Sequence, residues 1–137
     1  MTRDEILNMK PGRELDALVA EKVMGYRVYT QSYPSIVEEK TVEVEYIEYQ
    51  LENETIRGIL PHYSTDNAAA LEVAIHLQKQ GYYVCIDLKA CEETSVGVYE
   101  ENPAEQIAYA KAQTPAEAIS KAALLAVMEW KEFVEEK

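Results

Sequence analysis

The sequence predicts an α+β fold, an α/β sandwich in which an antiparallel or mixed sheet packs with two long helices and carries an extended β-hairpin around residues 40–60. Three observations support this class. Residues 41–51 alternate apolar and polar side chains, residues 68–80 and 114–134 repeat apolar side chains at helical spacing, and residues 82–88 form a nearly continuous apolar run. A chain of 137 residues holds one core, so we expect a single domain over residues 1–137.

The first part of the chain is predicted to be helical and then to enter a sheet. Residues 2–8 begin with a capping threonine, and residues 12–25 place apolar side chains on one helical face that ends at Gly25. The aromatic and β-branched residues 26–30 predict a strand, which we expect to turn near Tyr33 and Pro34.

The hairpin is predicted from alternation and a turn. Residues 41–51 pair with residues 55–60 through a turn at residues 52–54. The apolar set lies on even positions up to Tyr46 and on odd positions from Ile47 to Leu51. Because a β-bulge shifts the alternation by one residue, we predict a bulge near Tyr46 and Ile47.

The second half alternates helices and strands. Residues 68–80 predict a helix that ends at Gly81, with Leu71 and Ile75 on its apolar side. The run at residues 82–88 is typical of a central strand covered on both faces. Two further strands are expected at residues 94–99 and 106–110, with a loop at residues 100–103. A final helix has a capping Thr114 and the apolar stripe Ile119, Ala122, Ala123, Ala126, Val127, Trp130 and Val134.

The charge balance and the cysteines limit the partners and the compartment. The net charge is −12 at pH 7, which repels phosphate backbones and anionic lipids, so we expect neither a nucleic-acid polymer nor a membrane as partner. No apolar segment follows Met1, and no apolar run reaches the roughly 18 residues of a membrane span. Cys85 and Cys91 are too few for a disulfide framework and predict reduced thiols in a cytosolic protein.

A polar cluster at residues 62–66 precedes the first long helix. Ser64 or Asp66 is placed to cap that helix by accepting a backbone hydrogen bond. A catalytic arrangement with His62 is the alternative, but such triads are usually built from residues distant in sequence, so we favour the cap. With no visible nucleophile and base pair and no phosphate-binding loop, we expect no catalytic residues, no cofactor and no enzymatic activity.

Metal binding is not expected. His62 and His76 are the only histidines. Adjacent carboxylates in an extended chain point to opposite sides, so we interpret three acidic pairs as solvated surface: Glu38 and Glu39, Glu92 and Glu93, and Glu100 and Glu101.

Tyrosine is the unusual feature of the composition, with ten tyrosines against one Phe and one Trp. Its flat ring and hydroxyl suit ligand and protein surfaces, although half-buried sheet positions explain many tyrosines as well. Arg27 and Arg57 lie on or beside predicted strands and are the best candidates to bind an anion. The tyrosines placed to accompany them are Tyr26, Tyr29, Tyr82 and Tyr83.

Four segments resemble the phage ABA-sandwich domain family. They are MTRDEILNMKPGRELDALVAEKVMG, PHYSTDNAAALEV, GYYV and TPAEAISKAALLAVME, which cover about half of the chain in the order of the family. Where the family commonly carries Trp after the first and second helices, this sequence has Tyr26 and Tyr82.

The chain also resembles the Thoeris anti-defence sponge proteins. This resemblance implies a non-enzymatic phage protein of the host cytoplasm that sequesters a nucleotide-derived immune signal, of the cyclic ADP-ribose type or a cyclic oligonucleotide. It implies stacking tyrosines for adenine, Arg27 and Arg57 for a pyrophosphate, and Lys111 as the only obvious further clamp. We expect a homo-oligomer, because Tyr46, Tyr49 and the hairpin expose apolar surface. The alternative hypothesis is an acidic phage interaction protein that blocks a basic host protein.

Overall fold

A computed structural model describes residues 2–37, 40–90, 92–100 and 105–135, with side chains up to Met128 in the last helix. The elements, in chain order, are α1 (Arg3–Asn8), α2 (Arg13–Leu18), the π-helical turn η1 (Val19–Val23), β1 (Arg27–Pro34), β2 (Thr41–Leu51), β3 (Glu54–Ile59), α3 (Asn67–Lys79), β4 (Tyr82–Asp87), β5 (Thr94–Glu100), β6 (Glu105–Ala112) and α4 (Pro115–Glu135).

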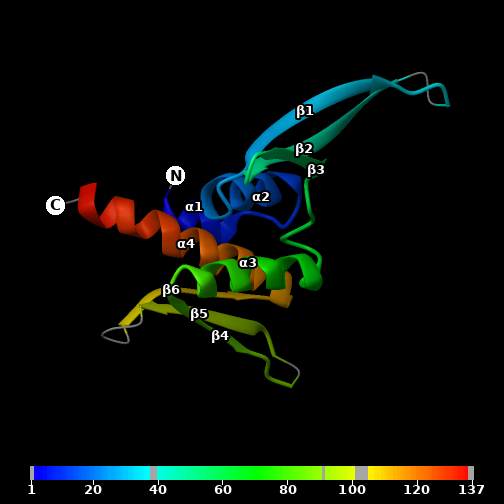
Figure 1. Cartoon of the computed structure of the whole chain (residues 1–137). Coiled ribbons are helices and arrows are strands. Elements are labelled where there is room, and N and C mark those ends of the chain that lie inside the picture. Colours follow the sequence, from blue (N-terminus) through cyan, green and yellow to red (C-terminus); the bar gives the residue numbers. More distant parts are fainter. Residues whose placement is uncertain (1, 38–39, 91, 101–104, 136–137) are drawn as a thin grey trace.

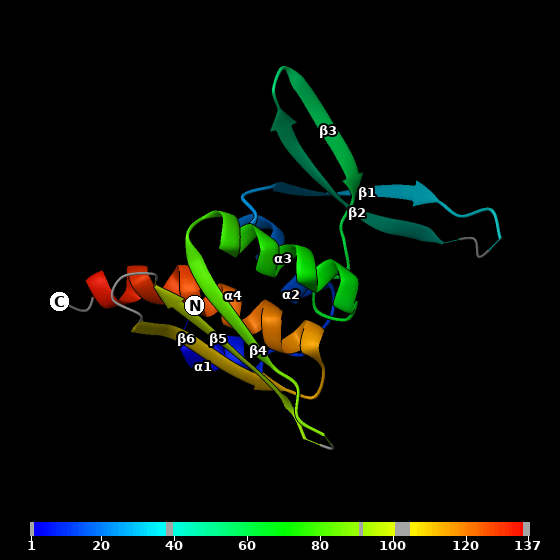
Figure 2. The same ribbon diagram turned by 60° about the horizontal axis from the view of Figure 1, so that its bottom comes forward.

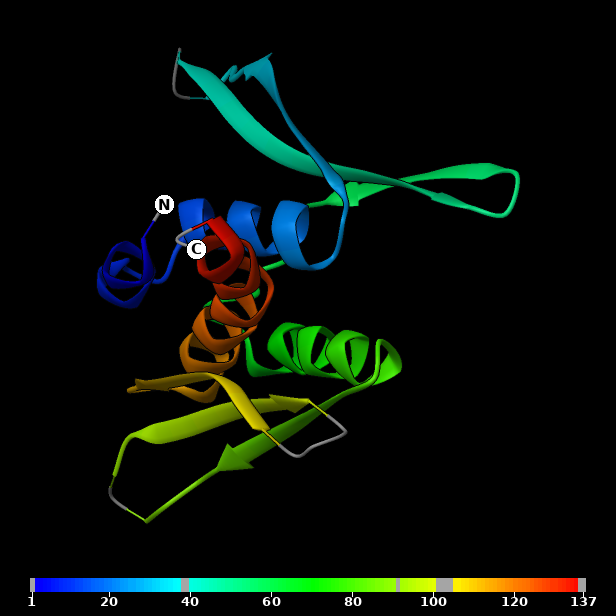
Figure 3. The ribbon, with the colours of Figure 1, turned by 90° about the vertical axis from the view of Figure 1, so that its left-hand side faces the viewer.

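The helices lie between two three-stranded antiparallel sheets (Figure 1). Sheet A has the order β1-β2-β3 and sheet B the order β4-β5-β6. In Figure 3, sheet A lies above α1 and α2, and sheet B lies below α3 and α4. The α+β class and the hairpin are therefore confirmed, with two separate sheets where the sequence suggested one.

The centre of the fold is α4. Every described side chain from residue 118 to 126 is buried, because α1, α3, η1 and sheet B surround this helix. Alanine at many of these positions lets the neighbours approach closely. Thr114 caps the helix as expected, accepting a hydrogen bond from the Glu117 N–H group at 3.2 Å. The side chains of Trp130 and Val134 lie outside the described part of the chain.

Polar side chains connect α4 to the layers around it. The Lys121 ammonium donates to the Leu7 carbonyl at the end of α1, at 2.9 Å. The Ser120 hydroxyl donates to the carbonyl of Tyr63 at 2.8 Å. Because a buried donor without a partner costs about 1–3 kcal/mol, these bonds fix where α1 and residues 60–66 lie on α4.

Sheet A corrects two predictions. The turn expected near Tyr33 and Pro34 begins only after them, because β1 continues to Pro34 in unbroken register with β2. The bulge near Tyr46 and Ile47 is absent from the pairing of β2 with both neighbours. Alternation continues through β2, and Ile47 is buried towards the helices whereas the apolar residues before it face outward.

Sheet B and α3 correct two further predictions. The strand at residues 82–88 was expected to be central, but β4 is an edge strand and β5 is the central one. The helix α3 buries Ala70, Val73, Ala74 and Leu77, which leaves Leu71 and Ile75 exposed. The apolar pattern of α3 extends over more than the face that the core covers, so periodicity alone could not select that face.

A buried polar network joins sheet A to the helices. The carboxylate of Asp16 in α2 is fully buried and accepts hydrogen bonds from the Ser64 N–H and hydroxyl groups at 2.7 and 2.6 Å. It also accepts from Arg13 at 3.1 Å. The same guanidinium donates to Glu45 of β2 at 3.0 Å and to the Leu60 carbonyl at 2.8 Å. Both strands of the hairpin are thereby anchored at one point.

We expect Asp16→Ala to lower the free energy of unfolding by about 3 kcal/mol, because it leaves the buried donors of Ser64 without this acceptor and removes the ion pair with the partly exposed Arg13. Urea denaturation followed by circular dichroism measures this. Glu14→Ala is the matched control, since Glu14 is an exposed carboxylate in the same helix, and it should change stability by no more than about 0.5 kcal/mol. Equal losses in the two variants would contradict the role of the network.

A second expectation concerns Gly97 in β5. A Cβ atom there would lie 2.9 Å from the Tyr99 ring and 3.1 Å from the Gln106 amide nitrogen, so we expect Gly97→Ala to destabilise by roughly 1–3 kcal/mol. Gly58→Ala in β3 is the control, because no atom lies within 4 Å of the added Cβ. The same urea titration should show Gly58→Ala to be neutral or slightly stabilising. A neutral Gly97→Ala would show that the Tyr99 ring does not need this space.

Candidate functional site

The register of sheet A places two rows of side chains across its outer face. Arg27, Glu48 and Arg57 are cross-strand partners in the first row. Tyr29, Tyr46 and Ile59 form the next row. Paired residues of antiparallel strands lie side by side on one face, and neighbours along a strand point to opposite faces. Since Ile47 is buried towards the helices, both rows face away from the body of the protein.

The first row carries a net positive charge. The Glu48 carboxylate accepts hydrogen bonds from Arg27 Nη1 at 3.0 Å and from Arg57 Nε at 2.8 Å. The Arg27 and Arg57 side chains remain 67% and 66% exposed. Two guanidinium groups against one carboxylate leave one unit of positive charge. The hydrogen bonds from Arg57 and Arg27 lower the pKa of Glu48, and its carboxylate raises the pKa of Arg57.

The second row is aromatic. The rings of Tyr29 and Tyr46 stack with their centroids 5.5 Å apart, and the Arg27 guanidinium lies 5.1 Å from the centre of the Tyr29 ring. The hydroxyls of Tyr33 and Tyr46 are 3.0 Å apart. This hydrogen bond, followed by burial and the nearby phenols, raises the pKa of Tyr46. The ring is therefore uncharged at neutral pH and offers a face for stacking.

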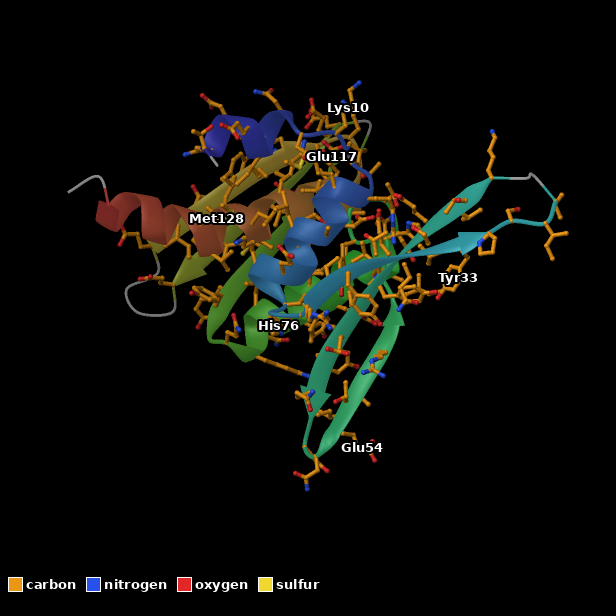
Figure 4. All side chains as sticks on the ribbon, turned by 90° about the horizontal axis from the view of Figure 1, so that it is seen from above. Lys10, Tyr33, Glu54, His76, Glu117 and Met128 are labelled. Carbon is orange, nitrogen blue, oxygen red and sulfur yellow. The ribbon has the colours of Figure 1, made fainter. Side chains whose placement is uncertain are left out.

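The two rows line a groove, which we call the sheet A groove. Its volume is about 510 Å³, and it is lined by Arg27, Tyr29, Gln31, Tyr33, Tyr46, Glu48, Arg57, Gly58 and Ile59. In Figure 4 the labelled Tyr33 lies on the projecting arm of β1 and β2, and Glu54 lies at the end of the arm of β2 and β3. The groove therefore lies where the two arms meet.

A second cavity of about 450 Å³ adjoins the groove and shares Arg27 and Glu48 with it. Tyr26 and Tyr49 form its wall, with ring centroids 4.6 Å apart. Burial, more than the neighbouring Tyr49 and Glu72, raises the pKa of Tyr26. These two tyrosines pack against the core and against each other, so much of their surface is already covered.

The structure divides the predicted binding residues into two groups. Arg27, Arg57, Tyr26 and Tyr29 meet at the sheet A groove and its neighbouring cavity. Tyr82, Tyr83 and Lys111 lie in sheet B, on the other side of the helical layer (Figure 1). Lys111 instead borders a polar groove of about 560 Å³ with Lys89, Glu92, Glu93, Ser95 and Gln113.

The sequence analysis missed Tyr46 and Glu48 as groove residues. The turn expected at residues 52–54 is one residue shorter in the structure, which sets Leu51 opposite Glu54 and Glu48 opposite Arg57. Counting back from the expected turn would have placed Glu48 opposite Gly58, so the register depended on a single residue of the turn. The pairing of Arg27 with Glu48 depends on the length of the connection between β1 and β2, for which the sequence carries no comparable signal.

The polar cluster before α3 is a cap and a structural anchor. Asp66 caps α3 by accepting from the Ala68 N–H group at 3.0 Å, which confirms the favoured interpretation. Ser64 is fully buried and donates to Asp16. The His62 ring nitrogen Nδ1 lies 3.0 Å from Arg13 Nη1 and contacts neither the Ser64 hydroxyl nor a carboxylate in the described hydrogen bonds. Ser64 and His62 therefore do not form a nucleophile and base pair.

Two other kinds of feature are absent from the described part of the chain. No group of three or more His, Cys, Asp or Glu side chains is placed there to hold a metal ion. None of its helices is long and apolar enough to cross a membrane. Glu92 and Glu93 are exposed, whereas Cys91 and residues 38, 39 and 101–103 lie outside the described ranges.

The comparison with protein families identifies a match. A family model, the phage ABA sandwich domain, matches residues 17–124, which span the end of α2, η1, both sheets, α3 and the first half of α4. No curated protein matches the chain.

The ion pairs of Glu48 in the sheet A groove predict that the folding stability depends on pH. The folded-state pKa of Glu48 is depressed by Arg57 and Arg27, so the stabilisation from these ion pairs is present above the unfolded-state pKa and is lost as the pH falls through the folded-state pKa. We expect the loss of stability on acidification to be smaller in Glu48→Gln than in the wild type, and the carboxyl ¹³C signal of Glu48 should titrate below the usual range of glutamate. Glu54→Gln, at the hairpin tip, is the control. Parallel acid curves for the wild type and Glu48→Gln would contradict the ion pairs.

Proposed function

The chain belongs to the phage ABA sandwich domain family, and on this premise we propose that it is a non-enzymatic phage protein that sequesters a nucleotide-derived immune signal in the host cytoplasm. The ligand class is a cyclic ADP-ribose type of molecule or a cyclic oligonucleotide. Sequestration would lower the free concentration of the signal and so block the bacterial defence that responds to it.

The observation that carries the proposal is the meeting of two exposed arginines with stacked tyrosines in one groove. A ligand of this class joins a planar base to a phosphate or pyrophosphate. Guanidinium groups donate paired hydrogen bonds to phosphate oxygens, and tyrosine rings stack on bases. The groove volume of about 510 Å³ lies within the roughly 300–1,000 Å³ that is usual for small-molecule sites.

Glu48 has a defined part in this proposal. Its carboxylate accepts a hydrogen bond from each of the Arg27 and Arg57 guanidinium groups and so holds them close together. Their positions are therefore set before a ligand binds. It also accepts hydrogen bonds, which suits a ribose hydroxyl or the adenine amino group. The remaining positive charge is local, in a protein whose net charge is −12, so the groove attracts an anion only at short range.

Tight sequestration requires that most of the ligand is covered. The groove lies on an outward sheet face, and a second copy of the chain is the partner that we propose for covering it. Tyr46 and Tyr49, on which the expectation of a homo-oligomer was based, are half buried by stacking within one copy. The exposed apolar side chains of this region are instead Tyr33, Ile36, Val37, Val42, Leu51 and Ile59.

The second candidate is an acidic interaction protein that blocks a basic host protein. The net charge of −12 favours it, because such a surface complements a basic partner. This hypothesis predicts that a pull-down captures a basic host protein. It also predicts that no nucleotide shifts the midpoint of thermal unfolding, whereas the sponge predicts such a shift.

Isothermal titration calorimetry with cyclic ADP-ribose isomers and with cyclic di- and trinucleotides tests the sponge. We expect one of these ligands to bind the wild type, and Arg27→Gln and Arg57→Gln each to weaken binding by about 10- to 100-fold, since a charge-assisted hydrogen bond contributes roughly 1.5–3 kcal/mol. Lys79→Gln is the control, because it makes the same change of charge at an exposed position on α3.

Three results decide between the hypotheses. Absence of heat with every ligand at high protein concentration would refute the sponge. Equal loss of binding in Arg57→Gln and Lys79→Gln would mean that the groove is not the site. Recovery of an intact ligand after denaturation of the complex supports sequestration, whereas a cleaved ligand would show that the protein is an enzyme.

A further inference from the structure

The edge of sheet B formed by β4 is open and almost uncharged. Strand β4, with the sequence YYVCID, has β5 as its only partner among the described strands. Its six residues contain one charge, at the terminal Asp87, and no proline or lysine. Natural sheets usually protect an edge with lysine, proline, a bulge or a covering segment. Figure 2 shows β4 at the margin of its sheet, next to α3.

The other edges in the described sheets carry such protection. β1 contains Arg27 and Pro34, and β3 contains Glu54 and Arg57. β6 contains Lys111 as well as Glu105, and it packs against α4. The β4 edge is therefore the exception, and its backbone N–H and C=O groups are available for another strand.

An exposed apolar stripe lies on α3, the helix that packs on β4. Leu71 and Ile75 are one helical turn apart and are 50% and 39% exposed. The core face of α3, with Ala70, Val73, Ala74 and Leu77, packs on α4 and β4, so the stripe lies outside that face. Ile86, on the helix-facing side of β4, is also 36% exposed.

We propose that two copies of the chain pair through β4 in antiparallel fashion, which joins their B sheets into one six-stranded sheet and packs the two α3 stripes against each other. A two-fold axis perpendicular to the sheet places each strand antiparallel to its own copy, so the edge is complementary to itself. The same axis places α3 beside α3. The interface is distinct from the sheet A groove, and it does not depend on what that groove binds.

The faces of the two sheets restrict the register. Ile86 faces the helices and Cys85 faces outward, and these faces must continue across the new pair. In an antiparallel pair, two residues that lie opposite each other must then both have even numbers or both have odd numbers. The two-fold axis therefore passes beside one residue, which pairs with its own copy. For a six-residue strand the two centred registers place the axis at Val84 or at Cys85. Both keep Leu71 and Ile75 near their copies.

A second copy fits this edge better than a basic protein does. The patch of Leu71, Ile75 and Ile86 is aliphatic, and it offers no carboxylate to a basic partner. An exposed apolar patch of a few hundred Å² typically marks a protein interface, and an added strand contributes main-chain hydrogen bonds as well. Because two copies with a charge of −12 each repel one another, added salt should strengthen the dimer.

Sedimentation velocity over a hundredfold range of concentration tests the proposal. We expect the wild type to dimerise, and Ile86→Lys and Leu71→Lys each to raise the dimer dissociation constant at least tenfold, since an inward charge at a sheet edge blocks pairing. Lysine lowers the net negative charge, so the loss cannot be attributed to added repulsion. Tyr109→Lys is the matched control, because Tyr109 is 37% exposed on β6, at the opposite edge of sheet B. Leu51→Lys tests the sheet A hairpin separately. Circular dichroism verifies that each variant folds.

Three results would overturn the proposal. The first is a wild type that stays monomeric over the whole range. The second is a dimer that Leu51→Lys disrupts and Ile86→Lys does not, which would place the interface in sheet A. The third is an oligomer that all these variants retain.

Thiol cross-linking provides an independent measurement. In the Cys91→Ser background, Cys85 would lie directly opposite its copy in one allowed register and diagonally, two residues along the strand, in the other. The two residues would then be roughly 5–8 Å apart. A short bis-maleimide should therefore give a covalent dimer of Cys91→Ser and at least tenfold less when Leu71→Lys is added to it. Equal cross-linking in the two, or none in either when sedimentation shows a dimer, would contradict pairing through β4.

Discussion

The fully buried carboxylate of Asp16 is the contact on which the arrangement of sheet A and the helices depends. A buried charge is tolerated only when hydrogen bonds and a counter-ion satisfy it, and here Ser64 and Arg13 do so. Arg13 also connects this contact to sheet A, because its guanidinium donates to Glu45 and to the Leu60 carbonyl. Asp16 and Arg13 of α2 thus position β2, the end of β3 and the segment that leads into α3. In the polar cluster before α3, Ser64 meets this packing requirement and Asp66 caps the helix.

The way sheet A is held explains why a groove exists on it. The sheet contacts the helices through one face, at Ile47 and the stacked Tyr26 and Tyr49, and its other face has no covering layer among the described residues. Charged and aromatic side chains on that free face satisfy one another across the strands, with Glu48 between two arginines. The abundance of tyrosine therefore has two origins, because some rings complete the core contact and others line the groove.

The two surfaces singled out by the structure lie on opposite sides of the helical layer (Figure 3). Pairing through β4 would leave the sheet A groove open to solvent. A ligand enclosed at the groove would then need a separate contact, at the arms that carry Tyr33 and Leu51. Two independent interfaces on one chain would generate assemblies larger than a dimer, and either interface could be lost without the other.

The sequence by itself determined the features whose causes are local. These are the caps at Asp66 and Thr114, the helix stops at glycine and the length of β2. Only the tertiary structure decided which apolar faces are covered. Alternation in β2 suggested a bulge, and the apolar run of β4 suggested a central strand, because a pattern records which side chains avoid water and not what packs on them. The separation of the predicted binding residues between two sheets has the same cause: contacts between distant strands follow from how the helical layer is filled.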